Sequence, residues 1–90
     1  MYDNEMRFIE SLESALGFGV IWFRIDNERC GPTLVARWLP DNRHHMERHI
    51  SRINLAQIND INSYVGCIAN EMRAMYKKDT VDELKELPLG

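Results

Sequence analysis

The sequence predicts an α+β fold: an N-terminal helix, a β-hairpin, and one or two C-terminal helices packed on one face of a small antiparallel sheet. Apolar residues recur at helical spacing over residues 4–16 and again over 57–77. Between these segments, residues 18–25 and 33–39 are rich in β-branched and aromatic residues, which favours two strands. With only 90 residues, we expect one α+β domain over residues 1–78 and an acidic C-terminal tail over residues 79–90.

The first helix is predicted from a stripe of apolar residues on one of its faces. The members of this stripe are Phe8, Ile9, Leu12, Ala15 and Leu16. Asp3 or Asn4 can accept hydrogen bonds from the free amides of the first turn. Gly17 can end the helix in a left-handed conformation.

The two strands are separated by residues 26–32, a stretch that contains Gly31 and Pro32. This connection is too long for a two-residue turn, so we expect an irregular loop. Pro40 ends the second strand because proline lacks the N–H group that a continuing ladder needs.

One register of this hairpin separates an apolar face from a mixed face. If Ile25 lies opposite Leu34, the apolar face holds Ile21, Phe23, Ile25, Leu34, Ala36 and Trp38. The other face then holds Val20, Trp22, Arg24, Val35, Arg37 and Leu39, with Trp22 opposite Arg37 in position for a cation–π contact. A slip of one residue would change these pairs. Because two strands alone are marginal in water, we expect a third strand, a second subunit or a partner to complete the sheet.

Residues 41–77 contain two apolar stripes that are out of phase near residues 54–57. We interpret them as a short helix over residues 42–53 and a long helix near 57–77, with a third strand over residues 45–53 as the alternative. The long stripe consists of Ile58, Ile61, Val65, Ile68, Met72 and Met75.

The composition narrows the classes of function. The net charge of −3 argues against a mainly electrostatic nucleic-acid binder. No segment approaches the length of an apolar membrane span, and the acidic start lacks the apolar core of a signal peptide. We therefore expect a cytoplasmic protein without membrane contact, in which Cys30 and Cys67 are reduced thiols.

The candidates for chemistry are weak. On a helix, His45 and His49 would lie one turn apart, with His44 beside them, but the order His-Met-Glu-Arg-His lacks the HExxH pattern of metalloproteases. Cys30 has no accompanying pattern of a thiol nucleophile. We expect no catalytic residue, no metal and no cofactor, and hence no enzyme.

We expect instead a small non-enzymatic protein-binding module that acts as an inhibitor, adaptor or regulator of a larger partner. This profile fits compact inhibitors encoded by viruses or mobile elements, and it also fits cellular adaptors. Tryptophan and arginine dominate many protein interfaces, so the candidate partner-binding residues are Trp22, Arg24, Arg37, Arg43, Arg48 and Arg52.

Two alternatives are open. A nucleic-acid-binding module would use the strip of arginines and histidines over residues 43–52 together with an exposed tryptophan. A homodimer would form through the exposed strand edge or through the long helix.

Overall fold

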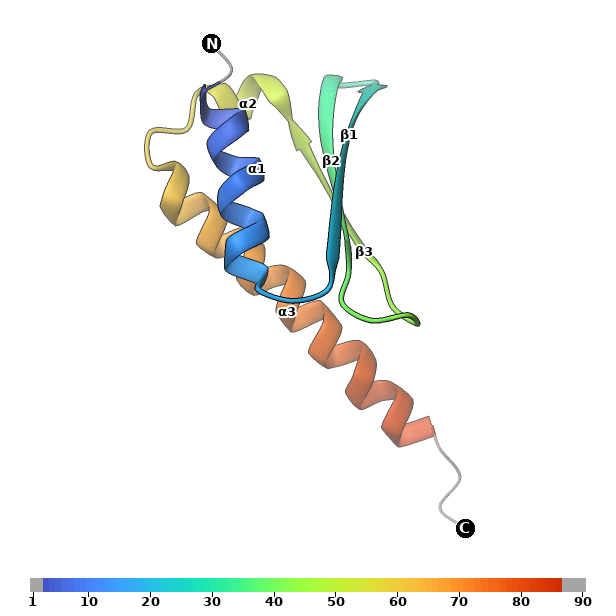
Figure 1. Ribbon diagram of the computed structural model, residues 1–90. Helices are drawn as coiled ribbons and strands as arrows, with labels where there is room; N and C mark the ends of the chain where they lie inside the picture. Colours follow the sequence, from blue (N-terminus) through green and yellow to red (C-terminus); the bar gives the residue numbers. More distant parts are fainter. Residues whose placement is uncertain (1–2, 87–90) are drawn as a thin grey trace.

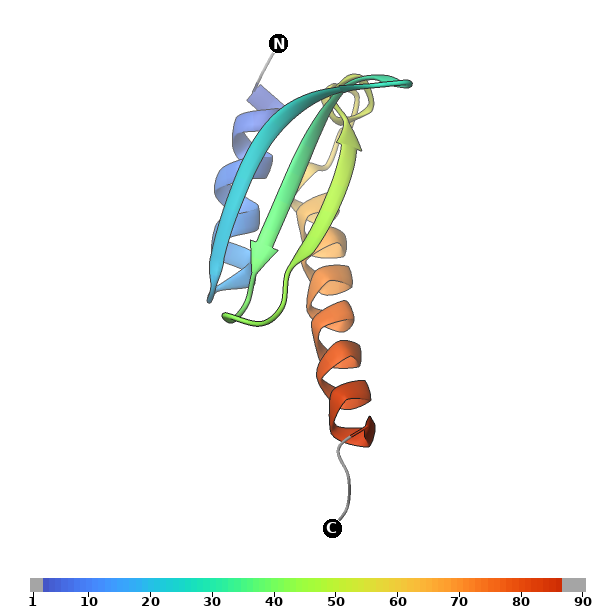
Figure 2. The same cartoon turned by 90° about the vertical axis from the view of Figure 1, so that its right-hand side faces the viewer.

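The computed structural model describes residues 3–86 and confirms the α+β class. The elements follow the order α1 (Asp3–Leu16), β1 (Val20–Glu28), β2 (Gly31–Leu39), β3 (Met46–Ser51), α2 (Arg52–Ala56) and α3 (Ile61–Glu86). The three strands form an antiparallel sheet in the order β1-β2-β3. The helices all lie on one side of this sheet, and its other face is uncovered (Figures 1 and 2).

The core lies between the helices and the inner face of the sheet. β2 contributes Leu34, Ala36 and Trp38, all of them buried. α1 packs against α3. The apolar stripes of both helices belong to the same core as these β2 residues. Their buried members are Phe8, Leu12, Leu16, Ile61, Val65, Ile68 and Met72. Met75, at the end of the predicted stripe, is exposed.

Of the registers that the sequence leaves open, the one with Ile25 opposite Leu34 is present, but the predicted irregular loop is wrong. Ile25 pairs with Leu34 and Trp22 with Arg37, and the ladder continues without interruption to Glu28 opposite Gly31. The connection is therefore a two-residue turn of Arg29 and Cys30. Gly31 has a φ of 107°, a conformation that side chains disfavour. β1 includes Asp26, Asn27 and Glu28, which are poor strand formers, because these residues pair with β2.

The favoured short helix over residues 42–53 is also wrong, and the alternative third strand is present as β3. β3 pairs along the second edge of β2, from Thr33 opposite Ser51 to Trp38 opposite Met46. Met46 and Ile50 point into the core, while Arg48, between them, forms an ion pair with Glu71 of α3 at 3.0 Å. A charged residue at an inward position conceals the alternation that would reveal this strand in the sequence.

α3 begins and ends later than expected. Ser51 caps α2, and the side chain of Asp60 accepts a hydrogen bond from the backbone N–H of Ser63 at the start of α3. The helix continues through residue 78 to Glu86 and projects past the sheet (Figure 1). The proposed domain boundary at residue 78 stays a prediction, and residues 87–90 of the proposed tail lie outside the described residues.

Long-range hydrogen bonds fix α1 at both of its ends. The side-chain amide of Asn4, which we expected to cap its own helix, donates to the carbonyls of Leu55 (3.0 Å) and Ile58 (2.8 Å). At the other end, Gly17 ends α1 with a φ of 78°, as predicted. The indole N–H of Trp38 then donates to the carbonyl of Phe18 at 2.9 Å, which holds the start of β1 against the core.

Gly19 is the tightest point of this connection. It has a φ of 80°, and a Cβ atom there would lie 2.5 Å from the carbonyl oxygen of Leu39. Gly31 also has a positive φ, but a Cβ atom there would meet open space. We therefore expect Gly31→Ala to lower the free energy of unfolding by roughly 1 kcal/mol. Gly19→Ala adds a backbone overlap, so we expect a loss of about 3 kcal/mol or more in urea unfolding. Equal losses for the two variants would contradict the close approach.

Candidate partner-binding face

The uncovered side of the sheet, called the open face below, is the candidate site. Figure 2 shows it with the three strands in front of the helices. Side chains alternate along each strand, so every second residue belongs to this face. β1 contributes Val20, Trp22, Arg24, Asp26 and Glu28; β2 contributes Thr33, Val35, Arg37 and Leu39; and β3 contributes Glu47, His49 and Ser51.

A network of ion pairs covers the middle of the open face. Arg24 contacts Asp26 at 3.0 Å and Glu47 at 3.3 Å. His49 bonds Glu28 through Nδ1 and Glu47 through Nε2. Val35 lies between Arg24 and His49 in the sheet and is fully buried although it has no helix above it. The network therefore shields an apolar residue in the central strand.

The same network shifts the titration of its members. The hydrogen bond that His49 donates to Glu28, with a second donated to Glu47, raises the pKa of His49 above its ordinary value. The hydrogen bond with His49 is the main cause that lowers the pKa of Glu47, and Arg24 adds to it. This part of the open face thus presents fixed, mutually paired charges.

The end of the open face beside the network has a different character. Trp22 is 59% exposed and lies opposite Arg37. The Nε atom of Arg37 is buried and has no hydrogen-bond partner among the described residues. Trp22, Phe23, Arg24 and Arg37 line a hollow of about 190 Å³. An exposed indole and an unsatisfied guanidinium N–H group therefore stand side by side.

The structure brings only part of the predicted residue set together. Trp22, Arg24 and Arg37 share the open face. Arg48 points toward α3 and pairs with Glu71, and Arg52 forms two hydrogen bonds with Glu5 of α1 at 2.6 and 2.9 Å. Arg43 is exposed in the connection between β2 and β3. The partner-binding role of these residues stays a prediction, but they do not form a single strip.

The three histidines are also separated, because β3 replaces the expected helix. His44 is packed beneath α3, His45 is exposed before β3, and His49 lies on the open face. No group of three or more potential ligands gathers within residues 3–86 in a way that could hold a metal ion. Cys30 and Cys67 are exposed and far apart in the chain, without a disulfide.

Sequence reasoning missed a polar cluster that joins the β2–β3 connection to α3. His44 contacts Asp41 through Nδ1 and Glu83 through Nε2, each at 2.9 Å. Tyr76 donates its hydroxyl proton to Asp41 at 2.8 Å, and its ring packs against His44. The spacing of Asp41 and His44 is visible in the sequence, but Tyr76 and Glu83 lie more than thirty residues away, where no local pattern connects them. This cluster stabilises the α3 contact, since its polar groups bond to one another.

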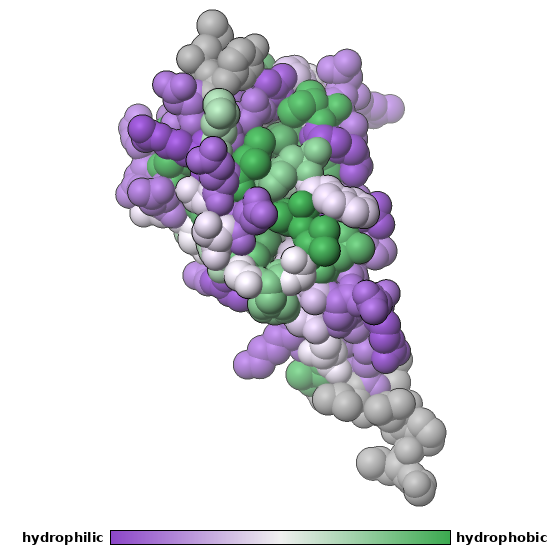
Figure 3. Space-filling model, viewed as in Figure 1, coloured by the Kyte–Doolittle hydropathy of each residue, from purple (hydrophilic) through white to green (hydrophobic). Residues whose placement is uncertain are grey.

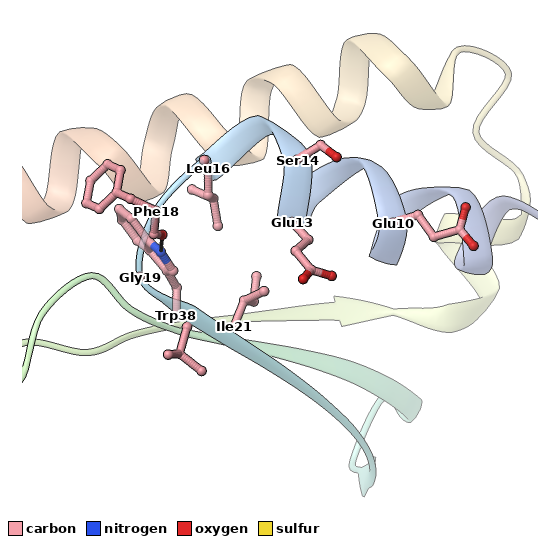
Figure 4. Close-up of a pocket in the computed structure, with 10 residues that line it drawn as sticks. Glu10, Glu13, Ser14, Leu16, Phe18, Gly19, Ile21 and Trp38 are labelled. Carbon is pink, nitrogen blue, oxygen red and sulfur yellow. Dashed lines mark hydrogen bonds between the residues drawn. The ribbon is translucent and has the colours of Figure 1, made fainter.

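A larger hollow lies between α1 and β1. It has a volume of about 650 Å³ and combines an apolar floor of Leu16, Phe18, Ile21 and Trp38 with a rim that includes Glu10 and Glu13 (Figure 4). The space-filling view shows an apolar patch on this side of the molecule, between the helix and the strand (Figure 3). α1 thus leaves part of the inner face of β1 uncovered.

Comparisons of the chain with known protein families, with curated proteins and with solved structures find no match. In the described part of the chain, no helix has the length and apolar character needed to cross a membrane.

The cluster around His44 predicts a defined pH dependence of stability. The hydrogen bond with Asp41, and then the charges of Asp41 and Glu83, raise the pKa of His44 above its ordinary value of 6.5. Its contribution to stability is therefore complete below pH 6.5 and is lost as the pH rises through the raised pKa. The bond with His44 also lowers the pKa of Asp41 below 3.8, so that contribution is complete above pH 3.8 and is lost at more acidic pH.

We expect the urea midpoint of the wild type to exceed that of His44→Gln most clearly between these limits, and the gap to narrow at alkaline pH. His45→Gln, an exposed histidine of the same connection, is the matched control and should keep the wild-type profile. A gap for His44→Gln that is constant across the pH series would contradict the role of protonated His44.

The ion pair of Arg52 with Glu5 predicts a cost in stability. Both side chains are partly buried, and the paired geometry of the guanidinium group is favourable. We expect Arg52→Ala to lower the free energy of unfolding by roughly 1 kcal/mol or more. Arg43→Ala, in the exposed connection, should change it by less than about 0.5 kcal/mol. Chemical unfolding of the two variants checks this ranking, and the reverse order would show it to be wrong.

Proposed function

We propose that the chain is a small, non-enzymatic protein-binding module that occupies a surface of a larger partner through its open face. In this role it acts as an inhibitor, adaptor or regulator, and it needs no cofactor and no catalytic residue. We place this activity in the cytoplasm. The observation that carries the proposal is the pairing of exposed Trp22 with Arg37 on a sheet face that no element of the described chain covers.

Trp22 supplies the apolar part of this contact. A tryptophan that is 59% exposed keeps a large apolar area in water, and covering that area is favourable. Val20 lies next to Trp22 on the same face and is also exposed. Together they form the apolar centre that protein interfaces commonly have.

Arg37 supplies the polar part. Its side chain is partly exposed and lines the hollow beside Trp22. A carboxylate or carbonyl oxygen of a partner placed in this hollow would accept a hydrogen bond from the guanidinium group. The preferred partner surface therefore presents an acidic or carbonyl acceptor next to an apolar side chain.

The neighbouring charges favour a protein over a nucleic acid as the partner. Asp26, Glu28 and Glu47 lie on the open face and would repel phosphate groups. Arg48 and Arg52, which the nucleic-acid alternative needs, form ion pairs with Glu71 and Glu5. Protein surfaces with mixed charge can match the paired groups of this face.

The test compares the partners retained by four tagged proteins: the wild type, Trp22→Ala, Arg37→Ala and the control Met6→Ala. Met6 is a matched control because it is 60% exposed but lies on α1, on the side of the sheet opposite to the open face. Each protein is used to capture partners from a lysate of the cells that express it, with and without nuclease, and the retained proteins are quantified by mass spectrometry.

We expect one protein to be retained by the wild type and by Met6→Ala after nuclease treatment, and its amount to fall at least about tenfold with Trp22→Ala and with Arg37→Ala. The losses should recur with the purified partner in calorimetry. Equal retention by all four proteins would refute the role of the open face. Retention that disappears with nuclease and falls steeply with salt would instead favour the nucleic-acid alternative.

A further inference from the structure

We propose that β1 pairs with β1 of a second copy of this chain, in antiparallel orientation and with Phe23 on the twofold axis. The pairing joins two three-stranded sheets into one sheet of twice the width, with the helices of both copies on the same side. This assembly goes beyond the proposed function, since its backbone pairing uses the edge of the sheet, and of the open-face residues it brings Trp22 and Arg24 together across the new interface.

β1 is the unprotected edge of the sheet. It is nine residues long, contains neither proline nor lysine, and pairs with β2 without a bulge from Val20 to Glu28. Natural proteins usually blunt such edges with short strands, bulges, prolines or charges. β1 carries Arg24, Asp26 and Glu28, but these charges all lie on the open face. The opposite edge strand, β3, is six residues long and also has a charged residue, Arg48, on its inner face. The two edges therefore differ, and β1 is the one suited to pairing.

The backbone groups available for pairing follow from the tight turn. Glu28 and Gly31 close a two-residue hairpin, so Glu28 and every second residue before it bond to β2. The N–H and C=O groups of Ile21, Phe23 and Ile25 consequently point to the free edge. A second β1 strand that runs antiparallel can bond to all three residues.

The sequence of β1 is complementary to itself in one register. With Phe23 opposite its own copy, Ile21 lies opposite Ile25 of the second copy, and Trp22 lies opposite Arg24 of the second copy. Each of these pairs occurs twice because of the symmetry. Opposed apolar residues and an aromatic residue opposite a cation are favourable cross-strand pairs.

The other symmetric registers are less favourable. Placing Arg24 on the axis sets two guanidinium groups opposite each other, which is destabilising. Placing Trp22 on the axis leaves Ile25 opposite Gly19, without an apolar partner. In the Phe23 register, Arg24 enters the interface with its charge already balanced by Asp26 and Glu47 of its own chain.

The exposed apolar groups near the edge support a second copy as the occupant. Ile25 is on the inner face but is 48% exposed, whereas Ile21 lines the hollow between α1 and β1. The Phe23 register brings Ile25 of the second copy beside Ile21, at the side of this hollow. In the dimer, Ile25 of the second copy would thus cover part of the apolar patch in Figure 3, and Ile25 would itself lose its exposure to solvent.

The first experiment measures the mass in solution, by sedimentation equilibrium from micromolar to millimolar concentration. We expect a dimer for the wild type, and a monomer for Ile25→Lys because two lysines would lie beside the axis in a desolvated interface. Ile53→Lys, with a comparable exposure on α2, is the matched control and should remain a dimer. Circular dichroism shows whether each variant is folded. A wild type that is monomeric throughout, or a folded Ile25→Lys that is still dimeric, would overturn the proposal.

The second experiment tests the register in a background without the native thiols, Cys30→Ser with Cys67→Ser. Phe23→Cys places two thiols directly opposite each other, at a Cα separation of about 5.5 Å, so mild oxidation should give a disulfide-linked dimer. In Ile21→Cys the two thiols are offset by four residues, or roughly 13 Å, and should not link. Efficient linkage through residue 21 and none through residue 23 would refute this register.

Discussion

The burial of Trp38 is the constraint on which the rest of the structure depends. Its ring is fully buried at the end of the central strand and packs edge-on against Phe18 and Tyr76. Its N–H group has to find an acceptor in the core, and the carbonyl of Phe18 provides it. This bond forces the chain to turn sharply between α1 and β1, where Gly19 leaves room for the backbone of Leu39. Through Tyr76, the same ring positions α3 and the polar cluster around Asp41.

The part of the fold that local patterns determine could be predicted from the sequence. The stripe of α1 and the two hairpin strands follow from apolar periodicity. The sequence leaves the hairpin register open, because it does not determine the length of the turn; in the structure the register places Leu34, Ala36 and Trp38 in the core. β3 could not be predicted with the same ease, since Arg48 interrupts its alternation and is balanced by Glu71, a residue of a distant helix. The candidate site follows the same division. Trp22 and Arg37 could be placed on one face in one of the possible registers, whereas the separation of Arg48 and Arg52 depends on ion pairs with Glu71 and Glu5 of distant helices.

The arrangement of the helices is the reason why we propose a function in interaction. All of the described helices cover one side of the sheet, which leaves the other face and a long strand edge uncovered (Figure 2). In the middle of that face, paired charges cover Val35. The uncovered apolar groups are concentrated near β1, where Trp22, Val20 and Ile25 are all exposed. Recognition of a partner would therefore use the open-face side chains of β1, and association with a second copy would use its backbone edge, with Trp22 next to both.

Because α3 is long, its two ends differ in how easily they unfold locally. The helix has 26 residues and spans roughly 39 Å, longer than the sheet that it lies against. Its first turns are anchored by Ile61, Val65, Ile68 and Met72, but beyond Tyr76 the contact described is the one between Glu83 and His44. Residues 77–79, 81 and 82 are exposed, so their amide protons should exchange with solvent far faster than those of the buried turns. A protease would accordingly trim this helix from its far end and leave the sheet and its packed helices intact.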